Sequence, residues 1–174
     1  MRQQQPEFSR PVRVETLGPA PREMAIEAGE EERAALARRF ALVAIDSLSA
    51  KAALSLRNET VTATGTLRAK VTQSCVATGL PVEAEVEEPF RVEFRPPPTV
   101  GEEEIELSDG ECDVVFYDGA SIDLGDAVAE TLSLSLDPWP RSAEADAVLR
   151  QAGVKSEAEA GPFAALAGLK NKLK

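Results

Sequence analysis

The sequence predicts an α+β protein built on an antiparallel β-sheet, with a few packed helices and a C-terminal amphipathic tail. Two long segments, 60–76 and 82–95, alternate apolar and polar residues, and shorter segments space their apolar residues as helices do. A strand with this alternation has one buried face and one solvated face, which is typical of antiparallel sheets. We therefore expect a one-sided sheet, either open or barrel-like, covered on its apolar face by the helices.

The two alternating segments predict a β-hairpin at the centre of the sheet, with a turn at 78–81. A register centred on this turn places Lys70 opposite Glu87 on the solvated face, a favourable cross-strand pair. On the buried face the same register pairs apolar residues, and the buried set includes Leu67, Val71, Cys75, Val86 and Phe90. Glu88 falls on the apolar parity, which predicts a bulge or an edge position there.

The remaining elements are shorter. Apolar spacing predicts a helix over 29–40 and a second helix capped by Asp123. Alternation predicts strands at 11–16, 41–57 and 112–117, and residues 141–160 are expected to be loosely helical. We expect a flexible N-terminal arm at 1–10, a single α+β domain at 11–140, and a polar linker with an amphipathic basic tail at 141–174.

Composition restricts the class of protein. The net charge is -11, which repels nucleic acid unless basic residues are segregated on one surface. No apolar run approaches the roughly 18 residues of a spanning helix, and the N-terminal sequence lacks the apolar stretch of a signal peptide. We therefore expect a cytoplasmic protein with reduced thiols and no membrane contact.

Catalytic and cofactor-binding motifs are missing from the sequence. There is no histidine, so neither a Ser-His-Asp triad nor histidine metal ligation is possible, and no glycine-rich phosphate-binding motif occurs. Cys75 and Cys112 are too few for a four-thiolate zinc site, and the acidic run at 102–106 is typical of a solvated loop. We expect no enzyme activity, no cofactor, no bound metal and no small-molecule substrate.

Three blocks of sequence carry a resemblance to a known family. They are VTQSCVATGLPV at 71–82, followed closely by Pro89 and Phe90; IDLGDAVAETLSLSLDPWP at 122–140; and GPFAALAGLK at 161–170. In this order and spacing they closely resemble the YceD-like family, a bacterial and plastid family associated with accumulation of large-subunit ribosomal RNA. The resemblance covers about residues 8–174.

One position departs from the family pattern. Many members have a Cys-x-x-Cys at the hairpin turn, and some have a later pair, which together suggest zinc binding. Here Cys75 matches the first cysteine, but Thr78 replaces the second, and Cys112 does not match the later pair. A metal role is therefore not carried over to this chain.

The resemblance implies a non-enzymatic factor that supports 23S ribosomal RNA accumulation and ribosome assembly, with ribosomal RNA or assembly proteins as partners. Direct RNA contact would use basic residues of the hairpin and the tail, namely Arg68, Lys70, Arg91, Arg95, Lys170, Lys172 and Lys174. Because the net charge of the chain is negative, ordinary surface charge is the favoured interpretation of these residues. The alternative is a protein-binding adaptor in which Phe163, Leu166 and Leu169 of the amphipathic tail dock into a partner groove without RNA contact.

Overall fold

The computed structural model describes residues 6–97, 113–117 and 120–154. The chain divides into two compact units. The first contains Met1–Gln73 and Glu83–Pro138, and the second contains Ser74–Val82 and Trp139–Lys174. Each unit is described by itself below.

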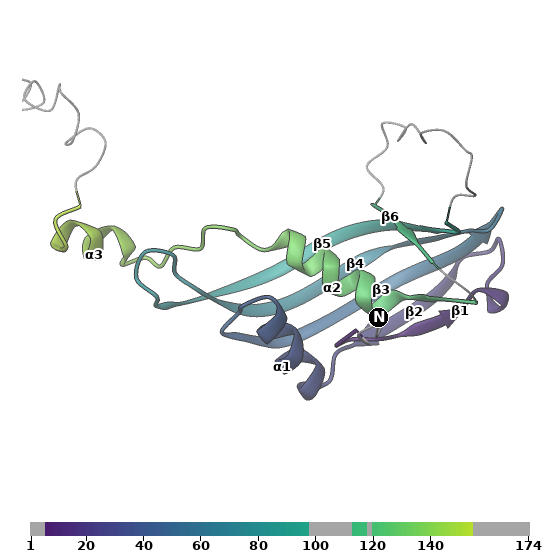
Figure 1. Ribbon diagram of the computed structural model, residues 1–174, viewed down its shortest axis with the longest axis horizontal. Helices are drawn as coiled ribbons and strands as arrows, with labels where there is room; N and C mark the ends of the chain where they lie inside the picture. The colour runs from purple at the N-terminus through teal and green to yellow at the C-terminus, as the bar shows by residue number, and fades with distance from the viewer. Residues whose placement is uncertain (1–5, 98–112, 118–119, 155–174) are drawn as a thin grey trace, which may run out of the picture. The chain divides into compact units, whose positions relative to one another are not determined.

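The first unit is built on a five-stranded sheet with the strand order β2-β3-β4-β5-β6 (Figure 1). The strands are β2 (Arg22–Glu27), β3 (Ala44–Arg57), β4 (Thr60–Ser74), β5 (Pro81–Arg95) and β6 (Asp113–Phe116). The sheet is mostly antiparallel, and only β6 runs parallel to its neighbour. Because β2 and β6 lie at opposite ends of this order and do not pair, the sheet is open, so the barrel-like alternative is wrong.

The predicted hairpin is present, and β4 is the middle strand of the sheet. Leu67, Val71 and Phe90 are buried, and Val86 is partly buried against the core. The alternating apolar residues therefore face the core as expected. The predicted contact of Lys70 with Glu87 is wrong, because Lys70 instead contacts Glu85, two residues along β5, and Glu87 contacts Arg68.

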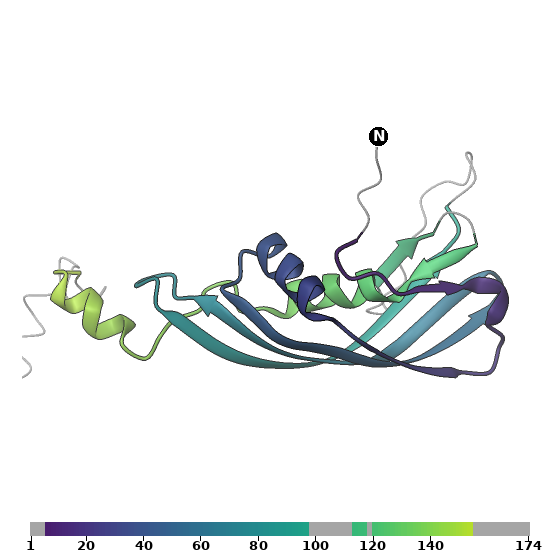
Figure 2. The same ribbon diagram turned by 90° about the horizontal axis from the view of Figure 1, so that it is seen from below.

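Two helices and a small second sheet cover one face of the large sheet (Figure 2). The small sheet pairs β1 (Pro11–Arg13) with β7 (Ser121–Asp123), and the helices are α1 (Glu30–Arg39) and α2 (Leu124–Ser135). Asp123 caps α2 as predicted, because its side chain accepts hydrogen bonds from the amides of Gly125 and Asp126. Leu36 of α1 and Leu132 of α2 are fully buried in the core between the layers.

Part of the predicted flexible arm is packed into the core, which corrects that expectation for residues 8–10. The Phe8 side chain is fully buried, and its backbone carbonyl lies so close to Gly125 that a Cβ there would stand 2.4 Å from the oxygen. Glycine in the first turn of α2 is what permits this approach. The arm is therefore held by apolar burial and by close packing on a helix.

The second unit contains the turn of the hairpin and the chain that follows α2. Its one helix in the described part of the chain is α3 (Ala145–Gln151), within the segment expected to be loosely helical. The Val76 amide donates to the Pro140 carbonyl at 2.9 Å, which joins the turn to this segment. None of the helices among the described residues is both long enough and apolar enough to cross a membrane.

Candidate functional site

The basic residues predicted on the solvated face of the hairpin all form ion pairs with neighbouring carboxylates. Arg68 contacts Glu87 and Lys70 contacts Glu85, each at 2.8 Å. Arg91 and Arg95 both contact the carboxylate of Glu93, which is partly buried between them. The structure thus brings these four cations onto one hairpin but gives each of them an acidic partner within the same sheet.

The pKa values of the carboxylates follow this pairing. A hydrogen bond from Lys70, together with its positive charge, lowers the pKa of Glu85, and the same contact raises the pKa of Lys70. The pKa of Glu93 is lowered chiefly by its hydrogen bond with Arg95. Both carboxylates therefore remain charged at neutral pH. An RNA phosphate would have to displace a carboxylate from each cation, in the field of a chain with a net charge of -11.

The second group of predicted contact residues lies in the C-terminal tail. Phe163, Leu166, Leu169, Lys170, Lys172 and Lys174 all fall outside the described residues. Their proposed roles in docking or RNA contact remain predictions. Cys112 also lies outside the described residues.

The hairpin turn contains the position at which the resemblance suggested a metal. Cys75 is a free, buried cysteine whose sulfur accepts a hydrogen bond from the Ser142 amide at 3.3 Å. Hydrogen bonds from the Thr78 side chain first, and from the Ser142 backbone second, lower the pKa of the Cys75 thiol to about 6. Thr78, in the place of the second cysteine, therefore acts as a hydrogen-bond donor to sulfur.

The turn is held by its own hydrogen bonds. The Gly79 amide donates to the Cys75 carbonyl at 2.9 Å, and the Cys75 amide donates to the Leu80 carbonyl at 2.8 Å. Gly79 has a φ of 73°, a left-handed conformation that glycine adopts without steric cost. In the part of the chain that the structure describes, no three Cys, Asp or Glu residues are grouped so that they could hold a metal ion.

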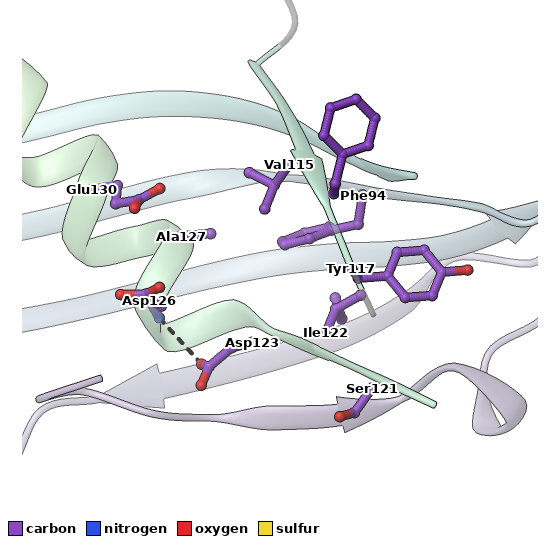
Figure 3. Close-up of a pocket in the computed structure, with 10 residues that line it drawn as sticks. Phe94, Val115, Tyr117, Ser121, Ile122, Asp123, Asp126, Ala127 and Glu130 are labelled. Carbon is purple, nitrogen blue, oxygen red and sulfur yellow. Dashed lines mark hydrogen bonds between the residues drawn. The ribbon is translucent and has the colours of Figure 1, made fainter. Parts of the chain in front are cut away.

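A cavity of about 340 Å³ lies between β6, β7 and the first turns of α2 (Figure 3). Phe94, Ile122 and Ala127 give it an apolar lining, and Asp126 and Glu130 lie on one side of it, one helical turn apart on α2. The sequence did not reveal this site, although β6, β7 and α2 are consecutive in the chain, because the cavity forms only where they fold together beside Phe94 of β5. The only sequence signal is the spacing of four between the two acidic residues, which places them on one helix face.

The cavity has the chemistry of a binding site. Its one hydroxyl-bearing aliphatic side chain, Ser121, has no histidine or lysine beside it among the described residues. Asp126 already contacts Arg39 at 3.4 Å, so Glu130 is the carboxylate that, with the apolar lining, suits a group with an aliphatic body and a positively charged end. Asp123, which also borders the cavity, is committed to capping α2.

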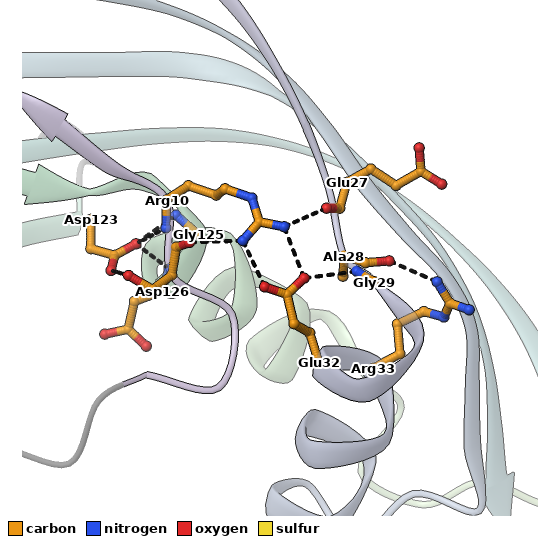
Figure 4. A network of polar contacts seen from close by, with 10 residues as sticks. Arg10, Glu27, Ala28, Gly29, Glu32, Arg33, Asp123, Gly125 and Asp126 are labelled. Carbon is orange, nitrogen blue, oxygen red and sulfur yellow. Dashed lines mark hydrogen bonds and ion pairs between the residues drawn. The ribbon is translucent and has the colours of Figure 1, made fainter.

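Asp123 also belongs to a polar network that holds the N-terminal segment (Figure 4). The Arg10 amide donates to Asp123 at 2.8 Å, and the Arg10 guanidinium contacts the Glu32 carboxylate at 2.7 and 2.8 Å. The guanidinium also donates to the backbone carbonyl of Glu27 at 2.7 Å. The hydrogen bond from Arg10 lowers the pKa of Glu32. This network joins β2, α1 and α2, so we assign it a structural role.

These features together define an acidic α+β protein with an open, one-sided sheet and no recognisable catalytic arrangement in the described residues. A family model described as "Large ribosomal RNA subunit accumulation protein YceD" matches residues 63–170. The chain belongs to this family, as the three sequence blocks indicated. Comparison with curated proteins and with solved structures gives no match.

Proposed function

We propose that this protein supports accumulation of large-subunit (23S) ribosomal RNA as a non-enzymatic factor, and that it acts through contacts with proteins. Family membership supplies the connection with ribosomal RNA. The observation that favours protein contact is the pairing of all four predicted hairpin cations with carboxylates of the same sheet. A cation that is already neutralised contributes little to the counterion release that drives binding to an RNA backbone.

The described surface supports a binding role in a second way. The cavity beside α2 combines an apolar lining with two carboxylates, and it contains no pair of nucleophile and base. Such a surface is suited to recognition of basic side chains on a protein. The amphipathic tail, with Phe163 and Leu166, provides a separate candidate contact for docking into a partner groove.

The proposal is tested first by deleting the gene and measuring the ratio of mature large-subunit to small-subunit ribosomal RNA. We expect the ratio to fall, and expression of the intact chain to restore it. An unchanged ratio at every growth temperature would overturn the ribosomal role.

The mode of action is tested by complementation with two variants. The double substitution Arg68→Gln and Lys70→Gln removes two hairpin cations, and truncation after Gly161 removes the tail lysines with Phe163 and Leu166. We expect the double variant to restore the RNA ratio fully and the truncated chain to restore it only in part. If the folded double variant fails to rescue, and purified protein binds RNA with a steep salt dependence, direct RNA contact replaces protein contact.

A further inference from the structure

Most of one edge of β5 has no neighbouring strand among the described residues. β6 pairs only with Val92–Arg95 at the end of β5, and it is the last strand on this side of the sheet. Figure 1 shows β6 beside only this end of the long strand. Among the described residues of the first unit, nothing pairs with the edge from Glu83 to Arg91, and this edge is called the open edge below.

The direction of the backbone groups on this edge follows from a hydrogen bond near the C-terminal end of β5. The Arg95 carbonyl accepts a hydrogen bond from the Tyr117 amide, which follows β6, so Arg95 directs its backbone groups away from β4. Successive residues of a strand alternate in this direction. Glu83, Glu85 and Glu87 therefore direct both amide and carbonyl groups to the open edge, and Pro89, which has no amide hydrogen, ends the run of donors.

The opposite edge of the sheet differs from this one. It is formed by β2, and the carbonyl of Glu27 there already accepts a hydrogen bond from the Arg10 guanidinium at 2.7 Å. The Ala28 amide donates to Leu48 of β3, so the odd residues of β2 direct their groups outward. One outward carbonyl of β2 thus accepts a hydrogen bond from the N-terminal segment. Among the described residues, no strand pairs with the open edge of β5 between Glu83 and Arg91.

Exposed strand edges in native proteins are templates for pairing with another strand, and side chains decide which strand is accepted. On the solvated face of β5, Glu83, Glu85 and Glu87 alternate along the open edge. On their other side, β4 already places Lys70 and Arg68 opposite two of these glutamates. Each of these ion pairs uses one carboxylate oxygen, Oε1, so a strand added at the open edge would meet the second oxygens of Glu85 and Glu87 as well as Glu83, and lysine or arginine at every second position gives complementary charge.

We propose that the open edge of β5, from Glu83 to Glu87, binds an extended peptide segment of a partner protein in which basic and apolar residues alternate. The partner's basic residues lie beside the glutamates on the solvated face. Its apolar residues lie on the other face, beside the partly buried Ala84 and Val86. This inference rests on the proposed function, because it specifies how the protein contact is made.

The charge pattern also argues against a second copy of the chain as the occupant. Two β5 edges paired with each other would place glutamates opposite glutamates, and like charges directly opposite in a sheet are destabilising. The acidic edge therefore disfavours self-association and leaves the edge accessible to a basic strand. Among possible occupants, the basic extended segment is the one that the observed charges favour.

The test uses the full chain and an acetylated peptide of alternating lysine and valine as the probe. We expect the peptide to bind, with amide chemical-shift changes concentrated at Glu83, Glu85 and Glu87. A peptide N-methylated at alternate residues, so that it cannot donate to the edge, should bind much more weakly. An alternating glutamate and valine peptide should not bind.

Two pairs of variants separate backbone pairing from simple charge attraction. Glu85→Pro removes an outward amide and a carboxylate from the β5 edge, so it is compared with Glu85→Gln, which removes only the charge. Ala25→Pro removes an outward amide from the β2 edge, and prolines are tolerated at such edge positions. We expect Glu85→Pro to weaken peptide binding by about fivefold or more relative to Glu85→Gln, as loss of a hydrogen bond predicts, and Ala25→Pro to leave it unchanged. Glu83→Lys should weaken binding of the basic peptide, while the exposed Glu23→Lys on β2 should not.

The outcomes are distinguishable from those that test the proposed function. Loss of peptide binding in Ala25→Pro but not in Glu85→Pro would overturn the assignment to β5, as would equal binding of the N-methylated peptide. If the purified chain does not bind the peptide, but deletion of the gene still lowers the ratio of large-subunit to small-subunit RNA, only the edge inference is overturned. The melting temperature of each variant shows whether it keeps the fold. If Glu85→Pro does not fold, peptide binding by Glu83→Lys tests the edge inference in its place.

Discussion

Leu67 lies in β4, the middle strand of the sheet, and its side chain is fully buried (0% exposed). Its partner across the pairing with β3 is Ala50, and Ala69 follows it on the same face, so its neighbours on the sheet are small. Substitution by alanine removes most of the side chain, and the small neighbours cannot fill the resulting cavity. The strand itself cannot move inward, because it is hydrogen-bonded on both sides. We therefore expect Leu67→Ala to lower the free energy of unfolding by about 3–5 kcal/mol, the upper part of the range for buried leucines.

The assay is urea unfolding followed by circular dichroism, supported by thermal melting. For a chain of this size, about 3–5 kcal/mol corresponds to a fall in melting temperature of roughly 6–20 °C. Leu134→Ala is the matched control, because Leu134 on α2 is 78% exposed, and its change should stay within about 0.5 kcal/mol. Equal losses for the two variants would refute the assignment of the buried face. Leu67→Asp, which places an unpaired charge in the core, should give no cooperative unfolding transition.

Three further predictions concern single positions. Gly65→Ala should destabilise by about 3 kcal/mol in urea unfolding, because its Cβ would stand 2.1 Å from a backbone carbonyl oxygen of β3. Asp123→Ala should cost about 1–2 kcal/mol through loss of the α2 cap, and Asp123→Asn should recover part of this. With Cys112 replaced by serine, thiolate absorbance at 240 nm should titrate near pH 6 for Cys75, and Thr78→Val should raise that pKa. The pKa of Cys75 is lower in the folded than in the unfolded chain, so ionisation of Cys75 should contribute its full stabilisation above the unfolded pKa, and this contribution should be lost as the pH falls towards 6. A free energy of unfolding that decreases as the pH rises from 6 to 9 in the wild type, but not in Cys75→Ala, would contradict this.

The sequence could predict which side chains of the hairpin strands face the core, because this alternation is a local property of each strand. A period of two over 15 residues in each strand assigns every side chain to a face, and the burial of Leu67 and Phe90 confirms it. The pairing of Lys70 with Glu87 could not be predicted equally well. A shift of two residues keeps every side chain on its face, so the hydrophobic pattern does not distinguish the two registers. The contacts within the turn, such as Cys75 to Leu80, decide between them.

The elements that the sequence did not reveal depend on distant contacts. β2 has one buried residue, Ile26, in a segment of six, so its alternation is too weak to stand out. The predicted strand at 11–16 is present as β1 over its first three residues, but its pairing with β7 spans more than 100 residues, and the burial of Phe8 depends on its approach to Gly125 of α2. The cavity beside α2 also depends on folding, because β6, β7 and α2, which are consecutive in the sequence, enclose it together with Phe94 of β5. The open edge of β5 is likewise defined by where β6 begins, at Asp113 beside Val92, which no pattern within β5 encodes.

The distribution of charge also supports the proposal that this acidic chain acts through contacts with proteins. Acidic residues exceed basic ones by 30 to 19, and two features of the first unit place a carboxylate beside apolar surface. Glu130 lies beside the apolar lining of the cavity, and Glu83 lies on the open edge beside the partly buried Ala84. Each feature therefore offers a carboxylate next to apolar atoms, which matches the aliphatic stem and charged end of lysine or arginine. A phosphate group has neither the charge nor the apolar part that these features require, so basic segments of proteins fit them better than an RNA backbone does.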